Sequence, residues 1–527
     1  MQDAENTRTV RNAGLYGSGI IISRLLGLLR DMLLAFVLGG GWVADIFLAA
    51  FRVPNFARRI IHEGAIAMAF MPFFNRLKNN QGLGEAYAFG RAAILQFVVG
   101  ASIITILCIW GSETISMILV PGFASDPMLI DLTGQLMEIA FFYLPLICIA
   151  ALMGGMLLSL GRFFSSSAAM ALLNVSMIGA GLFALLTGTG GFEAAKIFCY
   201  GILIGGVMQI AVLYPQLHRA GFRFLGRMAA HNEDLRSFKR KAPQTIFGSA
   251  AYQLGAVIAM FMASFLAEGS VTALYLAERI LEFPLALVGI ALGTASIGNF
   301  SQLVVSRQHA ELRRQMRQII AIGLCFSLPA AFGLLALAWP IMESFLFHGN
   351  FEANSLELTV RALVFYTPLI PAVVIGRPML AALNASGRAT TTMAISIFSL
   401  AVLIFGTIFL LRFFTLEAIT ISSSLAAWVN TALLGLLLRR CKVCFDACEP
   451  VQSIFPWKSL LAYLCFSIAM FAALMFLQMA LGHIGLGNAL CVIIGVPFGA
   501  AFYLGMCRVA KSPELKIVLD AFRKKQA

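Results

Sequence analysis

The sequence predicts an all-α polytopic membrane protein with 14 transmembrane helices. Of its 527 residues, 60% are hydrophobic and only 12% are charged, whereas soluble domains contain about 45–50% apolar and about 25% charged residues. Apolar runs of about 20 residues, the length that crosses a bilayer, follow one another with short polar breaks. No loop is long enough for a soluble catalytic domain, and we expect no enzyme.

The predicted helices begin near the start of the chain. Residues 1–12 are polar and mixed in charge, and the apolar run after them is long enough to span a membrane, which argues against a cleaved secretory signal. We expect spans at 13–38, 43–76 (long and kinked), 87–111, 132–160, 163–188, 193–216, 244–267, 270–303, 318–345, 358–384, 389–411, 416–438, 457–481 and 486–508.

Lysine and arginine are concentrated in the loops after even-numbered spans, and this sets the predicted orientation. The longest of these loops is basic from Arg219 to Lys241, while the loops after odd-numbered spans are short and nearly free of Lys and Arg, except for Arg412. Basic loops stay in the cytoplasm, so both termini are predicted to be cytoplasmic. The same bias explains the net charge of +13. We expect no nucleic-acid partner, because no basic surface interleaved with aromatic residues is visible.

Two halves of the chain carry similar motifs about 225 residues apart, which indicates an internal repeat. Residues 143–147 (Tyr-Leu-Pro-Leu-Ile) resemble residues 366–370 (Tyr-Thr-Pro-Leu-Ile), and the Leu-Gly-Arg that ends at Arg162 resembles the Ser-Gly-Arg that ends at Arg388. A weaker match pairs Arg52 with Arg279. Six spans return a chain to its starting side, so the halves form two lobes of the same orientation. The expected divisions are 1–216 (first lobe), 217–243 (cytoplasmic linker), 244–440 (second lobe), 441–508 (two extra spans) and 509–527 (cytoplasmic tail).

The first two predicted spans carry more charge than a helix facing lipid tolerates. A charge at the bilayer centre costs at least about 2.5–3.5 kcal/mol, so such residues face a bundle interior or a water-filled cavity. We therefore predict a cationic cavity for an anionic substrate, with snorkelling and structural ion pairs as the alternatives for individual arginines. The charged residues are Arg24, Arg30, Asp31, Asp45, Arg52, Arg58, Arg59, His62 and Glu63.

Helical periodicity places part of this charge on one face. At about 100° per residue, Asp45, Arg52, Arg59 and Glu63 fall within one narrow sector of the helix. Pro54 lies between them and can kink the helix, which re-aims everything after it. The pattern thus predicts acids and arginines that face the same space.

The predicted eighth span contributes a second charged group. Glu278, Arg279 and Glu282 are neighbours on a helix surface. Arginine suits a phosphate-bearing substrate because its planar fork donates two parallel hydrogen bonds and remains charged when dehydrated. We expect Arg279 to face the cavity, whereas Glu278, Glu282 and Arg59 would form a gate or an ion pair. The alternative is an ion pair that only holds the eighth span in place.

We predict no cofactor and no metal. A phosphate-cradling Gly-Lys-Ser/Thr loop is absent from the sequence, which excludes an ATP-driven pump of that type. Cys441, Cys444 and Cys448 form a C-x2-C-x3-C group without a fourth ligand and are expected to be reduced thiols; their role stays open. A membrane enzyme that transfers a prenyl-linked sugar is an alternative function, and it would need a pair of carboxylates, usually with a metal. Asp45 and Glu63 would lie about 27 Å apart on a straight helix, too far to share one metal.

The tail should form a short helix. Ser512 is suited to cap it, and Pro513 to be its first residue. Apolar residues alternate with Lys516, Arg523, Lys524 and Lys525, as in a helix that lies on an anionic leaflet. A plain soluble tail is the alternative.

Motifs along nearly the whole chain resemble the MurJ/MviN family of lipid II flippases. The most specific are in the N-terminal part, and those from Pro121 onward are less specific. They are Ser23-Arg-Leu-Leu-Gly27, Arg30-Asp31, Ala44-Asp45, Pro54-Asn55, Arg58-Arg59, Glu63-Gly64-Ala65, Pro72, Pro121-Gly-Phe123, Leu173-Asn-Val-Ser176, Glu268-Gly-Ser270, Ala273-Leu-Tyr275 and Ala291-Leu-Gly-Thr294.

The resemblance implies the fold of the multidrug/oligosaccharidyl-lipid/polysaccharide exporter superfamily, with two six-helix lobes around a central cavity. It implies a protein of the bacterial inner membrane that moves undecaprenyl-diphosphate-linked peptidoglycan precursor to the outer leaflet. We expect it to function as a monomer, although the sequence leaves the oligomeric state and the coupling ion open. Spans 13 and 14 would form a lipid-facing groove for the prenyl tail. The resemblance implies that Arg24, Arg30, Arg58 and Arg279 bind the substrate, with Asp45 and Glu63 nearby. To these predicted substrate-binding residues we add Arg52, Ser23 and Asn55.

Two departures from the family pattern concern the eighth span. Glu278 stands where the family often has Asp, and Ala-Ser-Ile-Gly-Asn299 follows Thr294 where a Pro is usual. A flippase for another prenyl-linked glycan remains an alternative function. A drug/cation antiporter of the same fold is another, although it predicts acids rather than arginines in the cavity.

Overall fold

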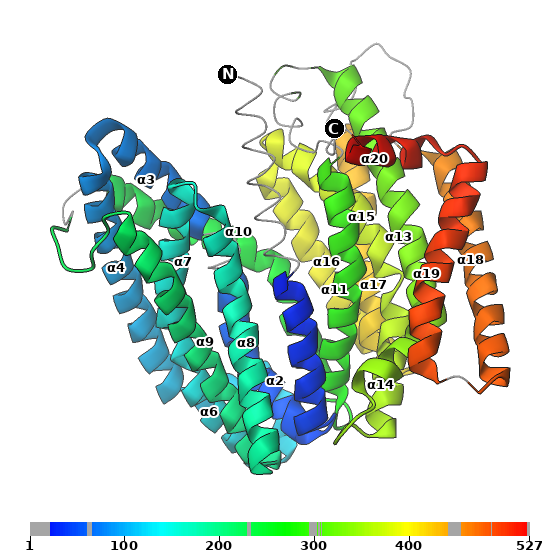
Figure 1. Ribbon diagram of the computed structural model, residues 1–527, viewed down its shortest axis with the longest axis horizontal. Helices are drawn as coiled ribbons and strands as arrows, with labels where there is room; N and C mark the ends of the chain where they lie inside the picture. The colour runs from blue at the N-terminus through cyan, green and yellow to red at the C-terminus, as the bar shows by residue number, and fades with distance from the viewer. Residues whose placement is uncertain are drawn as a thin grey trace. The chain divides into compact units, whose positions relative to one another are not determined.

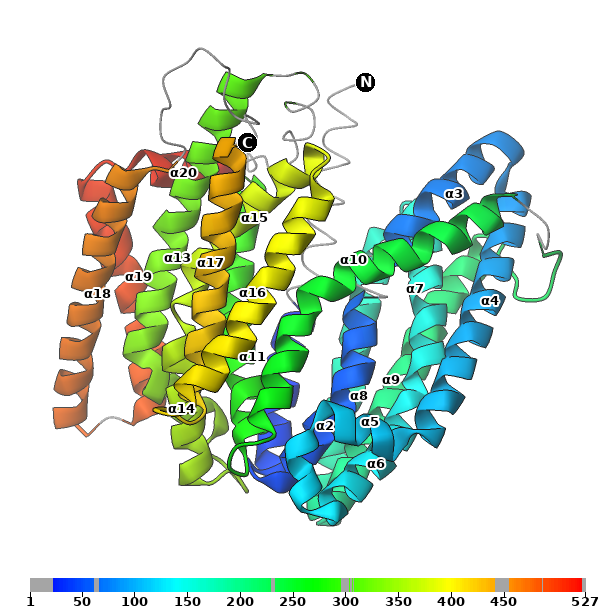
Figure 2. The same ribbon diagram turned by 180° about the vertical axis from the view of Figure 1, so that it is seen from behind.

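The computed structural model describes residues 22–60, 66–228, 233–294, 303, 306, 308–440, 455–485 and 487–523. Regular structure in these ranges is helical throughout (Figures 1 and 2). Nine helices in this part of the chain are long and apolar enough to cross a membrane, or ten if a bent pair counts as one span. The predicted class, an all-α membrane protein, is confirmed. Helix α2 (Trp42–Ile60) and helix α11 (Ser270–Thr294), which carry the predicted site charges, are not among the nine.

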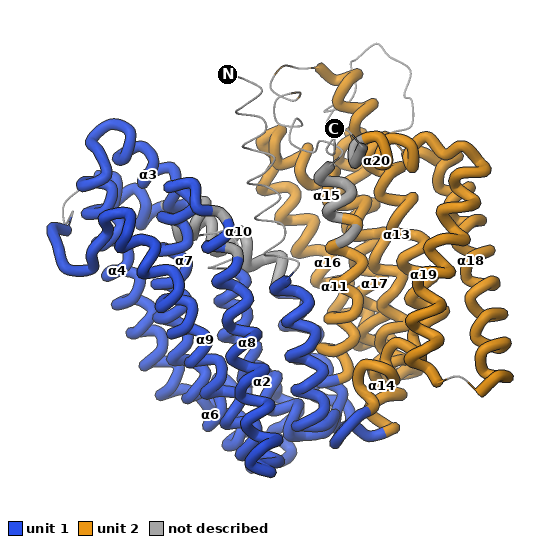
Figure 3. The backbone as a smooth tube through the Cα atoms, in the orientation of Figure 1, with its two compact units in different colours: residues 1–272, 348–352 blue, residues 273–347, 353–527 orange. Residues whose placement is uncertain are grey.

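The chain divides into two compact units (Figure 3). Unit 1 comprises residues 1–272 and 348–352, and unit 2 comprises residues 273–347 and 353–527. The predicted linker, 217–243, lies inside unit 1. Besides α2, the helices of unit 1 are residues 22–38, α3 (Ile66–Gln81), α4 (Leu83–Trp110), α5 (Ser112–Leu119), the 3-10 helix η2 (Pro121–Ser125), α6 (Pro127–Phe141), α7 (Tyr143–Ser159), α8 (Phe163–Thr187), α9 (Gly191–Arg219) and α10 (Glu233–Ala263).

Unit 2 is built from the remaining helices. In it α13 packs against α15, α18 and α19, while α17 packs against α14, α15 and α16. Most of α11 belongs to unit 2, although its first residues belong to unit 1. The other helices are α13 (His309–Leu346), α14 (Ala353–Tyr366), α15 (Leu369–Ala385), α16 (Ala389–Leu410), α17 (Glu417–Arg440), α18 (Trp457–His483), α19 (Asn488–Val509) and α20 (Pro513–Arg523).

Three predicted spans consist of two helices each. The predicted second span, 43–76, is α2 and α3, and residues 61–65 between them lie outside the described residues. The predicted fourth span is α6 and α7, which meet at Phe142. The predicted tenth span is α14 and α15, bent by 43°. Helix α5 and η2 were not predicted, because their eight and five residues are too short for a span pattern.

The internal repeat has the same local structure in both halves. Helices α7 and α15 each have 17 residues. The second residue after each helix is a glycine in the left-handed region, Gly161 at φ +79° and Gly387 at φ +75°. The next amide then bonds back to the last turn: Arg162 N donates to Leu157 O at 2.9 Å, and Arg388 N to Leu383 O at 3.1 Å. This is the Schellman end of a helix, and glycine adopts the required φ without strain.

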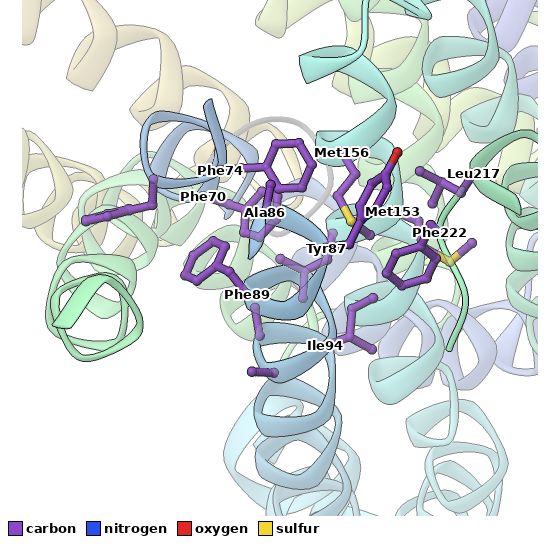
Figure 4. Packing of buried hydrophobic residues seen from close by; sticks show 14 of the residues in the cluster. Phe70, Phe74, Ala86, Tyr87, Phe89, Ile94, Met153, Met156, Leu217 and Phe222 are labelled. Carbon is purple, nitrogen blue, oxygen red and sulfur yellow. The ribbon is translucent and has the colours of Figure 1, made fainter. Parts of the chain in front are cut away.

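A cluster of buried aromatic side chains packs several helices together at one end of unit 1. Rings from α3 and α4 pack together, and Phe238 of α10 lies edge-on to Phe70 with ring centroids 5.8 Å apart. Phe70 also stacks on Phe89 at 5.2 Å, while Met156 of α7 and Phe222 of the α9–α10 loop cover the same cluster (Figure 4). Burying one such side chain from water contributes about 1.5–3 kcal/mol. The core therefore fixes how α3, α4, α7 and the start of α10 meet.

The tail forms the helix that its sequence predicts. Ser512 caps α20, accepting a bond from Leu515 N at 3.5 Å, and Pro513 is its first residue. Glu514 is buried and accepts bonds from Ser459 at 3.0 Å and from Tyr463, both on α18. The helix is thus fastened to α18 at its N-terminal end.

Candidate functional site

Arg30 lies in a buried network that joins two helices of unit 1. Its side chain is 4% exposed. Nε and one terminal nitrogen donate to Asp31 Oδ1 at 3.0 and 2.7 Å, and the other terminal nitrogen donates to Asn174 Oδ1 on α8 at 2.9 Å. Asn174 Nδ2 donates in turn to Ser23 O at 2.9 Å. The guanidinium also lies 5.6 Å from the ring centre of Phe51 on α2, a cation–π contact.

Asp45 binds the N-terminus of a neighbouring helix. Its carboxylate accepts bonds from Gly269 N at 2.7 Å, from Thr272 N at 2.8 Å and from the Thr272 hydroxyl at 2.6 Å. These amides open α11, where the first N–H groups have no partner inside the helix and a negative charge is favoured. Glu268 does the same for α2, accepting a bond from Trp42 N at 2.9 Å. The two acids therefore cap each other's helices.

The segment 348–352 binds the C-terminus of the helix formed by residues 22–38. Asn350 N donates to Phe36 O at 3.0 Å, and Asn350 Nδ2 donates to Val37 O at 2.8 Å. These carbonyls belong to the last turn of residues 22–38, whose C-terminal carbonyls lack helical partners. Three chain segments that join helices, 39–41, 268–269 and 348–352, thus meet at one end of unit 1 through backbone-directed hydrogen bonds.

The remaining charged residues of α2 are partly buried. Arg52 donates to Ala256 O of α10, so Arg52 and Asp45 both face residues 256–272. Arg58 donates through Nε and one terminal nitrogen to Asn55 Oδ1, each at 3.2 Å, and Asn55 is buried. Asn55 therefore holds the guanidinium of Arg58 in one orientation.

In unit 2, Arg279 contacts one tyrosine and one acid of its own helix. It donates to Glu282 Oε2 at 3.0 Å and to the Tyr275 hydroxyl at 3.0 Å, and its guanidinium lies 4.8 Å from the Tyr275 ring centre. The Tyr366 hydroxyl of α14 donates to Glu278 Oε1 at 3.3 Å. The side chain of Arg279 is 15% exposed. This arrangement holds the cation of Arg279 in a mostly apolar helix while part of its surface remains accessible.

The structure distributes the predicted site residues over three environments. Arg30 and Asp45 are buried and bound to protein groups, Ser23, Arg52, Arg58, Arg59, Arg279, Glu278 and Glu282 are partly buried, and Arg24 is exposed. Glu63 lies outside the described residues. Within unit 1 the network brings Ser23, Arg30 and Asn174 together. Within unit 2, Arg279 is paired with Glu282 on α11, and Glu278 of α11 is bound by Tyr366 of α14.

Several residues of these networks were absent from the predicted site. They share one sequence signal, a polar side chain inside or at the edge of an apolar run. In the described ranges no cluster of three His, Cys, Asp or Glu side chains is arranged to hold a metal, and Cys441, Cys444 and Cys448 lie outside those ranges. The residues left out of the predicted site are Asn174, Glu268, Thr272, Tyr275, Asn350 and Tyr366. The motifs quoted for the family contain Asn174, Glu268 and Tyr275, and the repeat motif contains Tyr366, so the motifs were a signal for these four.

The fold and the charged residues inside its helices define a polytopic membrane protein with polar groups held within the bundle. The chain has the fold of a solved lipid II flippase MurJ in an inward closed conformation, with TM-score 0.77, 21% identity and 94% of this chain and 98% of that chain covered. It also resembles an inward-facing MATE transporter of the MOP superfamily, with TM-score 0.65, 16% identity and 80% and 94% covered. The model of the lipid II flippase MurJ family matches residues 34–490, and the chain belongs to this family.

Curated relatives agree with this assignment. A probable lipid II flippase MurJ of Rhizobium tropici is 30% identical over 80% of this chain and 80% of its own length. A protein of the same description from Bdellovibrio bacteriovorus is 28% identical over 83% of each chain. The resemblance stated from the motifs is thereby confirmed, and the chain is a multi-pass membrane protein of a transporter family.

Proposed function

We propose that this protein moves lipid II, the undecaprenyl-diphosphate-linked peptidoglycan precursor, from the cytoplasmic to the outer leaflet of the bacterial inner membrane. Family membership over residues 34–490 is the observation that carries this proposal. The curated relatives described as probable lipid II flippases cover about four fifths of the chain. The MATE-like neighbours share the fold at 16% identity or less and therefore favour no drug substrate.

Arg279 is the residue we expect to bind the diphosphate most directly. Its guanidinium keeps accessible surface, and Tyr275 and Glu282 set its orientation. A guanidinium held in this way presents its remaining donors to an anion without first losing side-chain freedom. Arg24 and Arg58 are the matching residues of unit 1, since one is exposed and the other partly buried.

The guanidinium of Arg30 is bound to protein groups in this structure, so Arg30 either has a structural role or binds the substrate in another conformational state. To bind a phosphate it must release Asp31 and Asn174, which now accept its hydrogen bonds. Separating a buried charge from its partner costs about 3–5 kcal/mol. We therefore expect Arg30 to reach the substrate only in a state in which the helix 22–38 has moved away from α8. Arg52 and Asn55 would stabilise α2 through the contacts that they make in this state. We propose that Asp45, Glu63 and Ser23 lie near the substrate.

Alternating access is the mechanism we propose for a chain of 14 spans. Two six-helix lobes would bind the headgroup from the cytoplasm and release it outside, while the prenyl tail stays in lipid along a groove formed by α18 and α19. Only a difference in binding between the two states can drive this change, and the membrane potential acts on charges that move. One monomer carries every residue named here.

The mutual caps of Asp45 and Glu268 would take part in this cycle. They bind the first amides of α11 and α2, so these contacts must break when the N-terminus of α11 leaves α2. We propose that they hold the outer side closed while the headgroup enters from the cytoplasm.

Depletion of the protein in cells tests the proposed function. Labelled lipid II should accumulate in the inner leaflet and return to the outer leaflet when the wild-type chain is expressed. Arg279→Ala should fail to restore it, whereas Arg412→Ala, which removes an exposed arginine between α16 and α17, should restore it fully. Unchanged sidedness on depletion would refute lipid II as the substrate, and rescue by Arg279→Ala at normal expression would refute the arginine site.

A further inference from the structure

The loop between α9 and α10 is fastened to α4 by its backbone. Tyr87 of α4 donates to Ala220 O at 2.7 Å. Arg91 of α4 donates through Nε to Arg227 O at 2.8 Å and through a terminal nitrogen to Arg223 O at 3.2 Å. A single arginine thus holds both sides of the loop tip, so the loop keeps a defined shape without helical structure.

Two further contacts fix the same loop. Phe222 is fully buried, and the guanidinium of Arg91 lies 5.9 Å from its ring centre. Gly226 lies so close to Arg91 that an added Cβ would be 3.1 Å from its Cζ. Arg227 is paired with Glu85 of α4 at 3.1 Å. The loop therefore rests on the first turns of α4, and Phe224 stacks on Tyr214 of α9 with ring centroids 4.9 Å apart.

The outward side of this loop is apolar at its tip and basic beside it. Leu225 is 93% exposed, and Phe224 before it and Met228 at the end of the loop are partly exposed. Arg223 and Arg227 flank the tip and are exposed as well. No acidic residue occurs between residues 217 and 232. A rigid, exposed leucine between two arginines is typical of a surface that meets both apolar chains and anionic groups.

Helix α4 shows where this loop lies relative to the bilayer. Residues 92–110 contain no charge, and they span about 28 Å at about 1.5 Å per residue, close to the roughly 30 Å hydrocarbon core. Arg91 directly precedes this run. Leu95 and Val99 follow Arg91 by one and two turns on the same helix face, and both are about half exposed, as residues facing lipid are. The loop that Arg91 holds is therefore level with the boundary of the hydrocarbon, and it projects beyond α4 in Figure 2.

We propose that residues 223–228 anchor unit 1 to anionic phospholipids of the adjacent leaflet, which is the cytoplasmic one in the predicted orientation. Leu225 enters the boundary between headgroups and acyl chains, and Arg223 and Arg227 bind lipid phosphates. Basic residues next to a membrane are drawn to its anionic lipids, and apolar neighbours add affinity by leaving water. The anchor fixes the depth of α4 while other helices move.

A depth measurement tests the insertion. The full-length chain with Leu225→Trp is reconstituted in phosphatidylcholine vesicles that contain phosphatidylglycerol and phosphatidylcholine brominated near the headgroup end of the acyl chains. The signal is the quenching in excess of the wild-type protein, which has five Trp of its own. The matched control is Asn80→Trp, at an exposed residue just before α4. We expect quenching for Leu225→Trp only; equal quenching of the two variants would overturn the proposal and leave the loop as a docking surface for a protein.

A lipid-retention measurement tests the charge. Purified Arg223→Gln/Arg227→Gln protein should retain phosphatidylglycerol about fivefold less tightly for each arginine removed. The control Arg236→Gln/Lys239→Gln removes the same charge from exposed positions on α10, where the neighbouring Leu235 and Phe238 are buried. Retention that falls equally in both variants, or in neither, would overturn the assignment of anionic lipid to this loop.

Discussion

Charged residues inside the apolar helices of this protein are bound by other parts of the chain. Arg30 has an acid and an amide, and Asp45 has two amides and a hydroxyl. A charge without such partners would cost several kcal/mol in a membrane protein. Arg30 and Asp45 therefore have a structural role in this state, and a role toward a substrate requires them to exchange partners, whereas Arg279 keeps accessible surface while it is held.

At the residue scale, Asp45→Asn should destabilise the protein. The amide retains one oxygen but directs an NH₂ group toward donors, so at least one hydrogen bond of a charged acceptor is lost, at a cost of about 1.5–3 kcal/mol. The thermal unfolding midpoint of the purified protein should fall. Asp131→Asn is the control, because Asp131 is exposed and accepts only from Gln135 at 3.0 Å among the contacts described. Equal midpoints for the two variants would contradict the capping role of Asp45.

Tyr275→Phe should weaken transport while leaving the fold intact. The substitution keeps the ring that lies 4.8 Å from the Arg279 guanidinium but removes the hydroxyl that accepts its bond at 3.0 Å. A hydrogen bond to a charged group contributes about 1.5–3 kcal/mol, so the rate of lipid II flipping should fall by about tenfold or more. Tyr200→Phe, at an exposed tyrosine of α9, should flip at the wild-type rate. A Tyr275→Phe variant as fast as wild type would show that Arg279 needs no orienting hydroxyl.

The sequence indicated which residue types would matter but not their partners. Intramembrane charge singled out Arg30, Asp45 and Arg279, because charge in an apolar run is costly wherever it faces. The partner of Arg30 on α8, Asn174, lies 144 residues away, and the hydroxyl that binds Asp45 lies 227 residues away on Thr272. Periodicity describes one helix at a time, so it gives no information on contacts across such distances.

At the element scale, the length of an apolar run predicts most helices, but it does not predict where a span is divided into two helices. The ends of α8, α9, α16 and α18 lie within a few residues of their predicted spans. The bend of 43° between α14 and α15 lies where Pro368 follows Thr367, and an apolar run alone gives no sign of it. The repeated Gly-Arg pairs were the better signal, because they mark the ends of α7 and α15 in both halves.

Alanine at Gly387 and at Gly100 should shift stability in opposite directions. Gly387 has φ +75°, where a side chain costs about 1 kcal/mol, and no neighbouring atom within 4 Å of the added Cβ complicates the result. Gly100 lies inside α4 with equally open surroundings, so alanine there should gain about 1 kcal/mol of helix propensity. Thermal unfolding midpoints of the purified variants provide the comparison. A gain in stability for Gly387→Ala would contradict the proposed helix ending.

At the scale of the whole molecule, the orientation in the membrane decides which leaflet each surface meets. The exposed basic loop after α9 and the exposed arginines at the end of α17 belong to the cytoplasmic side if Lys and Arg are retained there. The loop between α16 and α17 would then face outward, as would the mutual caps at the starts of α2 and α11. Both the proposed direction of transport and the leaflet of the lipid anchor depend on this assignment.

Reporter fusions test the orientation of the whole chain. Alkaline phosphatase folds to an active form only where its disulfides can form, outside the cytoplasm. Fused after Thr415, between α16 and α17, it should be active; fused after Arg227, beyond α9, it should be inactive at similar expression. The reverse pattern would place the basic loops outside, contrary to the retention of Lys and Arg in the cytoplasm. It would also move the caps of Asp45 and Glu268 to the cytoplasmic side, where they would close the path by which the headgroup must enter.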